Sequence, residues 1–239
     1  MHFSLIIPLW NEERNVDQLI SSIDTSGLIN EGLHDVILVN NGSQDRTAVL
    51  IDRWAQKFSW IMPVHLKENL NYGGGVWEGF QHAHADVLCY LPGDNQYSMD
   101  DLKKIWMEYQ KLANEKKSKN LLLKGHRTVR KDGWDTRLVS KIYTFLANLL
   151  LQIKVRDVNG LPKIFHKDLL RSFPEEKMKT FVFDIQLIYT ARRKHWDIRE
   201  VPVTFYARRE GVSSWSGKRI NTYWNTFSQM IRLRHMHYR

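Results

Sequence analysis

The sequence predicts a single α/β domain in which a mostly parallel sheet is flanked by helices. Over the first hundred residues, short uncharged apolar runs alternate with stretches whose apolar residues recur at helical spacing. The apolar runs are hydrophobic at consecutive positions, which is typical of strands that are buried on both faces. No internal repeat or linker interrupts the 239 residues, a length that suits one large domain.

The first hundred residues contain four predicted strands, each followed by polar or turn-forming residues. Strands are expected at residues 3–8, 35–39, 62–66 and 87–91, and helices around 16–23, 45–58 and 76–85. The glycine-rich segment 69–75 is predicted to be a loop before the last of these helices. The carboxyl ends of parallel strands meet at one edge of a sheet, where open α/β folds bind ligands. We therefore expect the polar residues after these strands to form one cleft.

The second half of the chain mixes strands with longer helices. Helices are expected at 101–112 and 180–193, a helical turn at 167–173, and strands at 121–123, 161–165 and 198–205, the last containing Pro202. Segment 140–155 is strongly apolar but too short to cross a bilayer, so it is either a core helix or a helix lying in a membrane interface. The basic and aromatic tail 220–239 has two similar interpretations, packing on the domain or contact with an anionic membrane.

The composition narrows the class of partner. A net charge of +9 suits an acidic partner, which is a nucleic acid, an anionic membrane surface or a phosphorylated substrate. The basic residues are dispersed and no helix-turn-helix, RNP or zinc pattern occurs, so a nucleic-acid-binding protein is the weaker alternative. The single cysteine, Cys89, excludes an internal disulfide framework and fits a reducing compartment. The N-terminal residues lack the pattern of a signal peptide, so a cytoplasmic protein is expected.

A carboxylate follows the fourth predicted strand, because the run 87–91 leads through Pro92 and Gly93 to Asp94. Carboxylate oxygens suit Mg²⁺ or Mn²⁺, which bridge to phosphates. We expect Asp94 to anchor the metal-bound diphosphate of a nucleotide sugar. The alternative is an aspartate in a solvated turn that caps the helix expected from Ser98. The backbone N–H groups of the glycine segment are suited to approach the same phosphates.

Four motifs occur in order in the first hundred residues. They read SLIIPLWNEE at 4–13, VNNGSQDRT at 39–47, NLNYGGGVWEG at 69–79 and PGDNQ at 92–96. Later landmarks follow in order at 125–127, Arg137, 157–160, Asp184, 201–202 and 208–213. From about residue 3 to 214 the chain therefore resembles the family 2 GT-A glycosyltransferases, and among them the polyprenyl-phosphate sugar transferases. The resemblance implies a Rossmann-like GT-A domain over 1–215 and a basic-aromatic C-terminal helical tail over 216–239.

The resemblance also implies roles for individual residues. The donor nucleotide is expected to contact Pro8, Trp10, Glu12, Asn40, Asn41, Ser43, Asn71, Gly73 and Gly74. The metal ligands are expected to be Asp94 and Gln96, and the catalytic residues Asp94, Asp184, Arg127 and Arg208. The acceptor phosphate is expected to be held by Arg127, Arg137, Arg208 and Ser213, because arginine offers forked donors to phosphate.

Three positions depart from the family's pattern. Pro92 replaces the first acid of the metal motif, so Asp94 is the only carboxylate left of that pair. Asn40 and Asn41 stand where the family has an acidic pair, and amides still hydrogen-bond a base or ribose. Gln186 replaces the glutamate that follows Asp184 in the family. Mg²⁺ or Mn²⁺ remains the implied cofactor, and whether the chain requires it is left open by Pro92.

The function implied by the resemblance is inverting transfer of a sugar from a nucleotide-sugar donor to a polyprenyl-phosphate acceptor. A phosphate is already ionised at neutral pH and needs no general base. The alternative acceptor is a sugar hydroxyl of a glycan, which would need a carboxylate base such as Asp184 or, after it, Asp157. A sugar-binding homologue without catalysis is a further alternative. For the leading function we expect a protein peripherally bound to the cytoplasmic face of a membrane.

Overall fold

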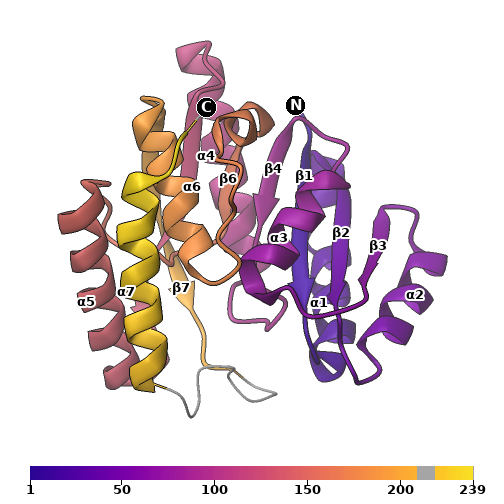
Figure 1. The fold of residues 1–239 in the computed structure, drawn as a ribbon. Coiled ribbons are helices and arrows are strands. Elements are labelled where there is room, and N and C mark those ends of the chain that lie inside the picture. Colours follow the sequence, from indigo (N-terminus) through magenta and orange to yellow (C-terminus); the bar gives the residue numbers. More distant parts are fainter. Residues whose placement is uncertain (209–218, 239) are drawn as a thin grey trace.

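The structure, a computed structural model, describes residues 1–208 and 219–238, and its centre is a seven-stranded sheet (Figure 1). The strands lie in the order β3-β2-β1-β4-β6-β5-β7. Their bounds are β1 (Phe3–Leu9), β2 (Leu33–Asn41), β3 (Ile61–Leu66), β4 (Val87–Tyr90), β5 (Leu121–Arg130), β6 (Lys163–His166) and β7 (Asp197–Phe205). All pairings are parallel except those of β6, which runs antiparallel to both β4 and β5. The prediction of a mostly parallel α/β sheet is confirmed.

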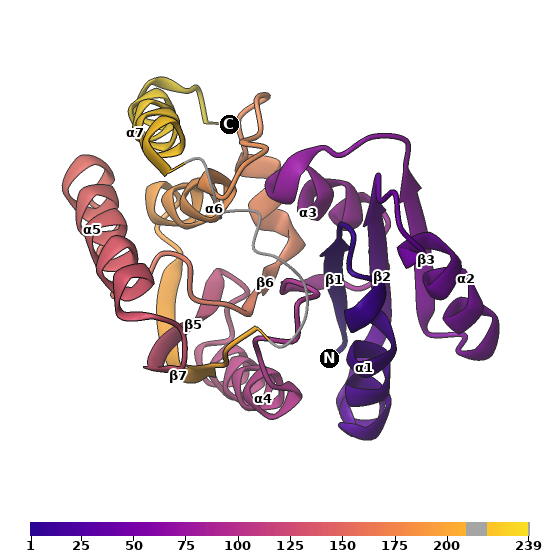
Figure 2. The ribbon, with the colours of Figure 1, turned by 90° about the horizontal axis from the view of Figure 1, so that it is seen from below.

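Helices cover both faces of the sheet. Their bounds are α1 (Glu13–Thr25), α2 (Thr47–Lys57), α3 (Asn71–Gln81), α4 (Met99–Lys116), α5 (Trp134–Leu151), α6 (Val182–Arg193) and α7 (Arg219–His235), with the short 3-10 helices η1 (Leu28–Glu31) and η2 (Lys167–Ser172). Viewed from below, α3 and α6 lie on one face and α1 and α4 on the other (Figure 2). The helices α5 and α7 lie side by side outside α6 (Figures 1 and 2).

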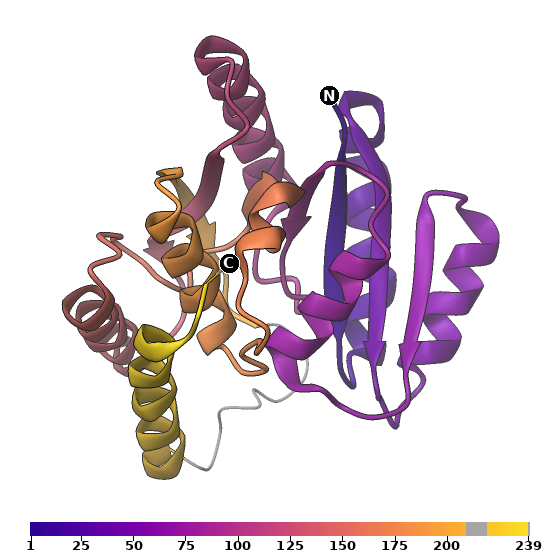
Figure 3. The same cartoon turned by 45° about the horizontal axis from the view of Figure 1, so that its top comes forward.

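The core lies in the sheet and beneath its helices. Leu5, Ile6 and Ile7 of β1 are fully buried, as expected for a strand with helices on both sides. The strands β1 to β4 and helices α1 to α3 form the N-terminal half, which stands beside the C-terminal half in Figure 3. In the described part of α7, Met230 and Leu233 are buried against the rest of the fold. The proposed boundary at residue 215 lies outside the described residues and stays a prediction.

Several element bounds differ from the expectations. The glycine segment is not a loop, because α3 begins at Asn71 and contains all three glycines. Asn69 Oδ1 accepts a hydrogen bond from the N–H of Asn71 at 2.7 Å, which satisfies a donor at the start of this helix. The helix expected at 140–155 begins earlier, at Trp134, and ends at Leu151, because Gln152 takes a left-handed conformation with φ of 52°.

Two further sequence features fit their places in the fold. Pro202 lies in β7, which pairs with β5 and is the last strand of the sheet among the described residues, an edge position where a strand tolerates proline. Ser98, not Asp94, caps α4, since its Oγ accepts a hydrogen bond from Asp101 N–H at 3.1 Å. Within the described residues, every helix is too short or too polar to cross a membrane.

Candidate active site at the carboxyl edge of the sheet

The segments that follow β1 and β2 are joined by reciprocal hydrogen bonds. The N–H of Asn11 donates to Ser43 Oγ at 3.0 Å, and Asn11 Oδ1 accepts from Gln44 N–H at 2.8 Å. The N–H of Glu12 donates to Thr47 Oγ1 at 2.9 Å. These hydrogen bonds hold the two segments together and position Glu12 at the carboxyl edge of the sheet. They also place Ser43, one of the predicted donor-site residues, at this edge beside Asn11.

The two asparagines at the end of β2 hold the surrounding backbone. Asn40 Oδ1 accepts from Ser43 N–H at 3.1 Å, and Asn40 Nδ2 lies 3.3 Å from His65 Nδ1. Asn41 Nδ2 donates to the carbonyl of Asn71 at 3.0 Å, and Asn41 Oδ1 accepts from Leu70 N–H at 2.9 Å. Both amides are buried. They therefore position the turn after β2 and the start of α3, and their predicted contact with the donor stays a prediction.

The glycines of α3 permit close packing between two parts of the chain. The N–H groups of Gly73 and Gly74 donate to the carbonyl of Lys179 at 2.7 and 3.3 Å. A Cβ on Gly73 would lie 2.4 Å from the carbonyl oxygen of Met178 and 2.6 Å from Phe183 Cβ. In this structure the Lys179 carbonyl accepts from both N–H groups, and their predicted contact with the donor phosphate stays a prediction. A phosphate contact through them requires the segment around Lys179 to move.

Glu12 and Asp94 converge on one cation, the guanidinium of Arg208. Arg208 Nη2 lies 3.2 Å from Glu12 Oε1 and 3.2 Å from Asp94 Oδ2. Burial raises the pKa of both carboxyl groups, and the positive charge of Arg208 opposes that rise. Two desolvated carboxylates that face each other require a cation between them. Glu12 and Asp94, which follow β1 and β4, thus meet at this edge, as expected of polar residues that follow parallel strands.

This acid pair also fits a divalent ion. Mg²⁺ is commonly held by one or two carboxylates together with substrate phosphates, and Asp94 and Glu12 offer carboxylates on two sides of one position. Among the described residues, no three acidic, histidine or cysteine side chains form a complete metal site. Gln96 donates its side-chain N–H to the carbonyl of Tyr206 at 2.8 Å, and its backbone N–H donates to Asp94 Oδ1 at 3.2 Å. Gln96 thus orients Asp94 in this structure.

Asp184 is buried in the first turn of α6 and is paired with a buried lysine. Its Oδ1 accepts from Lys163 Nζ at 2.7 Å and from the Tyr90 hydroxyl at 2.6 Å. Both Lys163 and Asp184 are almost completely buried. Burial lowers the pKa of Lys163 to about 8, against the raising effect of the Asp184 charge. Asp184 therefore anchors an internal network, and the sequence interpretation missed Lys163 and Tyr90.

Unpaired polar atoms lie buried around Asp184. Within the described part of the chain, the Tyr72 hydroxyl, the Tyr143 hydroxyl and Asn159 Oδ1 are buried and lack a hydrogen-bond partner. Burial raises the pKa of both tyrosines, and the charge of Asp184 adds to the rise in each. A buried polar atom without a partner is unfavourable unless a ligand supplies one. Tyr72 and Asn159 lie inside the motif segments 69–79 and 157–160, and Tyr143 inside the apolar segment 140–155, but the sequence interpretation assigned none of the three a role.

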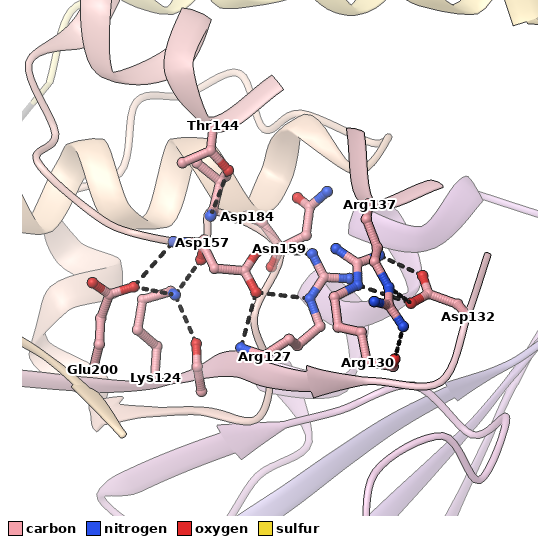
Figure 4. A network of polar contacts seen from close by, with 12 residues as sticks. Lys124, Arg127, Arg130, Asp132, Arg137, Thr144, Asp157, Asn159, Asp184 and Glu200 are labelled. Atoms are coloured by element: carbon pink, nitrogen blue, oxygen red, sulfur yellow. Dashed lines mark hydrogen bonds and ion pairs between the residues drawn. The ribbon is translucent and has the colours of Figure 1, made fainter. Parts of the chain in front are cut away.

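Arg127 forms a bidentate ion pair with Asp157 (Figure 4). Both contacts from the guanidinium to the carboxylate measure 2.7 Å, and the backbone N–H of Arg127 adds a third hydrogen bond at 3.1 Å. Despite burial, these hydrogen bonds and the Arg127 charge hold the pKa of Asp157 well below its usual range. Behind the pair, buried Lys124 donates to the carbonyl of Asp157 and to Glu200.

The outer side of this ion pair forms a basic cavity of about 240 Å³ between β5 and α5. We call it the basic pocket, and its lining residues are His126, Arg127, Thr128, Arg130, Arg137, Ser140, Lys141, Thr144, Arg156 and Asp157. Figure 4 shows Arg130 and Arg137 on the side of Arg127 away from Lys124. The cavity combines cationic groups with hydroxyls, which together suit a phosphate.

The predicted acceptor residues divide between two places. Arg127 and Arg137 line the basic pocket, whereas Arg208 lies with Glu12 and Asp94. Ser213 lies outside the described residues. Burial raises the pKa of Tyr97, and its hydroxyl lies close enough to both places to feel the charges of Arg127, Asp157 and Asp94.

A solved structure with a similar fold supports the GT-A class. It is glucosyl-3-phosphoglycerate synthase from Mycobacterium tuberculosis in complex with Mn²⁺, UDP-glucose and phosphoglyceric acid. The TM-score is 0.71 at 17% sequence identity, over 97% of this chain and 80% of that chain. At this identity the similarity establishes the fold, which is that of GT-A glycosyltransferases.

The family follows from the sequence match. The model described as "Glycosyl transferase family 2" matches residues 4–173, and the chain therefore belongs to glycosyl transferase family 2. A dolichyl-phosphate beta-glucosyltransferase of Trichomonas vaginalis is 24% identical over 223 residues, covering 85% of this chain and 65% of that protein. A dolichol-phosphate mannosyltransferase of Pyrococcus furiosus is 25% identical over 226 residues, covering 93% and 62%. A dodecaprenyl-phosphate galacturonate synthase of Rhizobium johnstonii is 26% identical over 223 residues, covering 90% and 62%. The chain thus spans less than two thirds of the length of these relatives.

Proposed function

We propose that the chain transfers a sugar, with inversion, from a nucleotide-sugar donor to the phosphate of a polyprenyl phosphate. The curated relatives carry names of polyprenyl-phosphate sugar transferases, and the cationic and hydroxyl groups of the basic pocket are suited to an acceptor phosphate. The donor diphosphate is assigned to the edge that carries Glu12, Asp94 and Arg208. The buried hydroxyls of Tyr72 and Tyr143 are assigned to the donor sugar, whose hydroxyl groups would supply their missing partners.

The choice of acceptor rests on the ion pairing of the two candidate bases, Asp157 and Asp184. Asp157 is held ionised by Arg127, with its pKa well below the usual range, so it is a poor proton acceptor near neutral pH. Asp184 is buried and ion-paired with Lys163. A hydroxyl acceptor needs a base, whereas an ionised phosphate needs only to be positioned. The arrangement therefore favours a phosphate over a sugar hydroxyl.

The chemical task for the chain is to stabilise the leaving nucleoside diphosphate. Arg208 is placed to contribute positive charge at the donor edge. Asp94, with Glu12 opposite, would hold Mg²⁺ or Mn²⁺, and such an ion supplies Lewis-acid stabilisation of the leaving group. We propose this ion as the cofactor because carboxylate oxygens suit it, and its binding between the two carboxylates would require Arg208, which pairs with both, to shift. The proposed acceptor is a membrane lipid, so we propose a peripheral position on the cytoplasmic face of a membrane.

The test is a transfer assay with the purified chain. Radiolabelled UDP-glucose, UDP-galacturonate and GDP-mannose are each offered with Mn²⁺ and with either polyprenyl phosphate or the corresponding polyprenol. We expect one donor to label the lipid phosphate and none to label the alcohol. Labelling of the polyprenol, or of an added glycan in place of the phosphate, would assign the chain to the hydroxyl-acceptor alternative. Absence of both donor binding and transfer for all three would leave the chain a homologue without this activity.

A further inference from the structure

The outer face of α5 carries an unusual set of exposed apolar side chains. Trp134, Leu138, Ile142, Phe145 and Leu149 are each between 51% and 79% exposed. They recur at intervals of three and four residues, which places them on one side of a helix. At about 100° per residue they fall within an arc of about 80°, and they extend over about 22 Å of the helix. We call this set the α5 stripe.

The α5 stripe faces away from the protein. The helix lies at the edge of the molecule with α7 beside it (Figures 1 and 2). Its opposite side is the one that packs, since Ala147 and Leu151 are buried and Tyr143 is half-buried. Contiguous exposed apolar surface of this kind is uncommon on a monomer and marks an interaction site.

Basic groups border the α5 stripe. Arg137 and Lys141 lie on the flank of α5 next to the stripe and also line the basic pocket, together with Arg130 and Arg156. The only acidic residue in the sequence of the helix is Asp135. A helix with a narrow apolar face and an adjoining basic flank is suited to lie in the interface of an anionic bilayer.

We propose that α5 docks the chain on an anionic lipid bilayer through this stripe. The apolar side chains enter the boundary between headgroups and acyl chains, and Arg137 and Lys141 stay at the level of the lipid phosphates. The same helix then presents its stripe to the membrane and its basic flank to the pocket. This inference deepens the proposed function, because a lipid phosphate in the basic pocket would have its hydrocarbon chain beside the stripe. Its test does not depend on catalysis.

The test measures the binding of the full chain to vesicles by flotation. The vesicles are an equal mixture of phosphatidylcholine and phosphatidylglycerol, compared with phosphatidylcholine alone. The test variant is Phe145→Ser/Leu149→Ser, which changes two exposed side chains and leaves the packed side of α5 intact. The matched control is Val49→Ser/Met107→Ser, which removes two similarly exposed apolar side chains from α2 and α4. Circular dichroism and the unfolding midpoint confirm that all variants fold.

We expect the wild-type chain and the control to bind the anionic vesicles equally and the test variant to bind at least about tenfold more weakly. Binding is expected to weaken in high salt and on the zwitterionic vesicles, because the basic flank contributes. Equal binding of all three proteins, or none by the wild type, would overturn the inference. So would a dimer in light scattering that the test variant dissociates, since the stripe would then pair with a second copy. A chain that binds vesicles through the stripe but transfers no sugar supports this inference and counts against the proposed function alone.

Discussion

The buried pair of Arg127 and Asp157 gives a quantitative prediction for stability. Arg127→Gln leaves the Asp157 carboxylate buried without its counter-charge. The lost contacts are two charge-assisted hydrogen bonds of 2.7 Å, each worth about 1.5–3 kcal/mol. Both side chains are less than a tenth exposed, so solvent screens the pair little. We therefore expect the free energy of unfolding to fall by about 3–5 kcal/mol.

The assay is urea unfolding at neutral pH, followed by tryptophan fluorescence, in a double-mutant cycle with Asp157→Asn. The double variant is expected to lose less than the sum of the single variants, because the two residues act on each other. Arg53→Gln is the matched control, since Arg53 pairs with Asp17 at the surface with both side chains more than half exposed. It should cost less than about 1 kcal/mol. A coupling energy for Arg127 and Asp157 below about 1 kcal/mol, the range of an exposed pair, would refute the reasoning.

Acidification tests the same ion pair, because the direction of its effect on stability follows from the shifted pKa of Asp157. The folded pKa of Asp157 is held below its ordinary value of 3.8, so the unfolded chain binds this proton more readily. The pair's contribution to the free energy of unfolding is therefore fully present above a pH of 3.8, the ordinary pKa of aspartate. It is lost as the pH falls from there through the pKa of Asp157 in the folded protein. The wild type should lose stability over that range, and Asp157→Asn should lack this part of the loss.

The remaining predictions concern the site. Lys163→Met should lower the free energy of unfolding by about 3–5 kcal/mol, because it leaves the buried Asp184 carboxylate without a counter-charge. In urea unfolding, the double variant Lys163→Met/Asp184→Leu should regain part of that lost free energy. Gly73→Ala should lower the thermal midpoint, since its Cβ would meet the carbonyl of Met178 at 2.4 Å, and an unchanged midpoint would contradict the packing role. Tyr143→Phe should weaken calorimetric binding of the nucleotide sugar but not of the free nucleoside diphosphate, if its buried hydroxyl meets the sugar. Mn²⁺-dependent binding of the nucleoside diphosphate should decline on acidification at a pH above the ordinary 3.8 of an aspartate, because burial raises the pKa of Asp94, and Asp94→Asn should abolish that dependence.

The sequence was sufficient to predict the sheet and the edge at which Glu12 and Asp94 meet. Uninterrupted apolar runs such as 35–39 and 87–91 have no stable place except a strand covered on both sides, and both are strands of the observed sheet. Once these strands are parallel, the polar residues after them must share an edge, and Glu12 and Asp94 do meet there. The antiparallel β6 was not predictable as an insertion between β4 and β5, because four residues carry no signal for their partners.

Misassigned features depend on contacts that are distant in the sequence. Three glycines in a row indicate a loop, yet Lys179 and Asn41 hold that segment as the start of a helix. The sequence around Asp184 gives no sign of Lys163, which only the fold brings to it, and the predicted catalytic role of Asp184 stays a prediction. Helical spacing in α5 gives the stripe, but only the packed structure shows which side of that helix is exposed. Propensity and pattern are local, whereas burial and ion pairing are properties of the whole fold.

The most direct test of the central claim is the KM for polyprenyl phosphate in the basic pocket. Lys141→Gln and Arg137→Gln each remove a positive charge from that pocket, and both side chains are exposed enough for the fold to tolerate the change. The account predicts that each variant raises the KM for polyprenyl phosphate about tenfold while the dissociation constant of the donor stays as in the wild type. An unchanged acceptor KM, or a loss confined to donor binding, would contradict the assignment of this pocket to the acceptor phosphate.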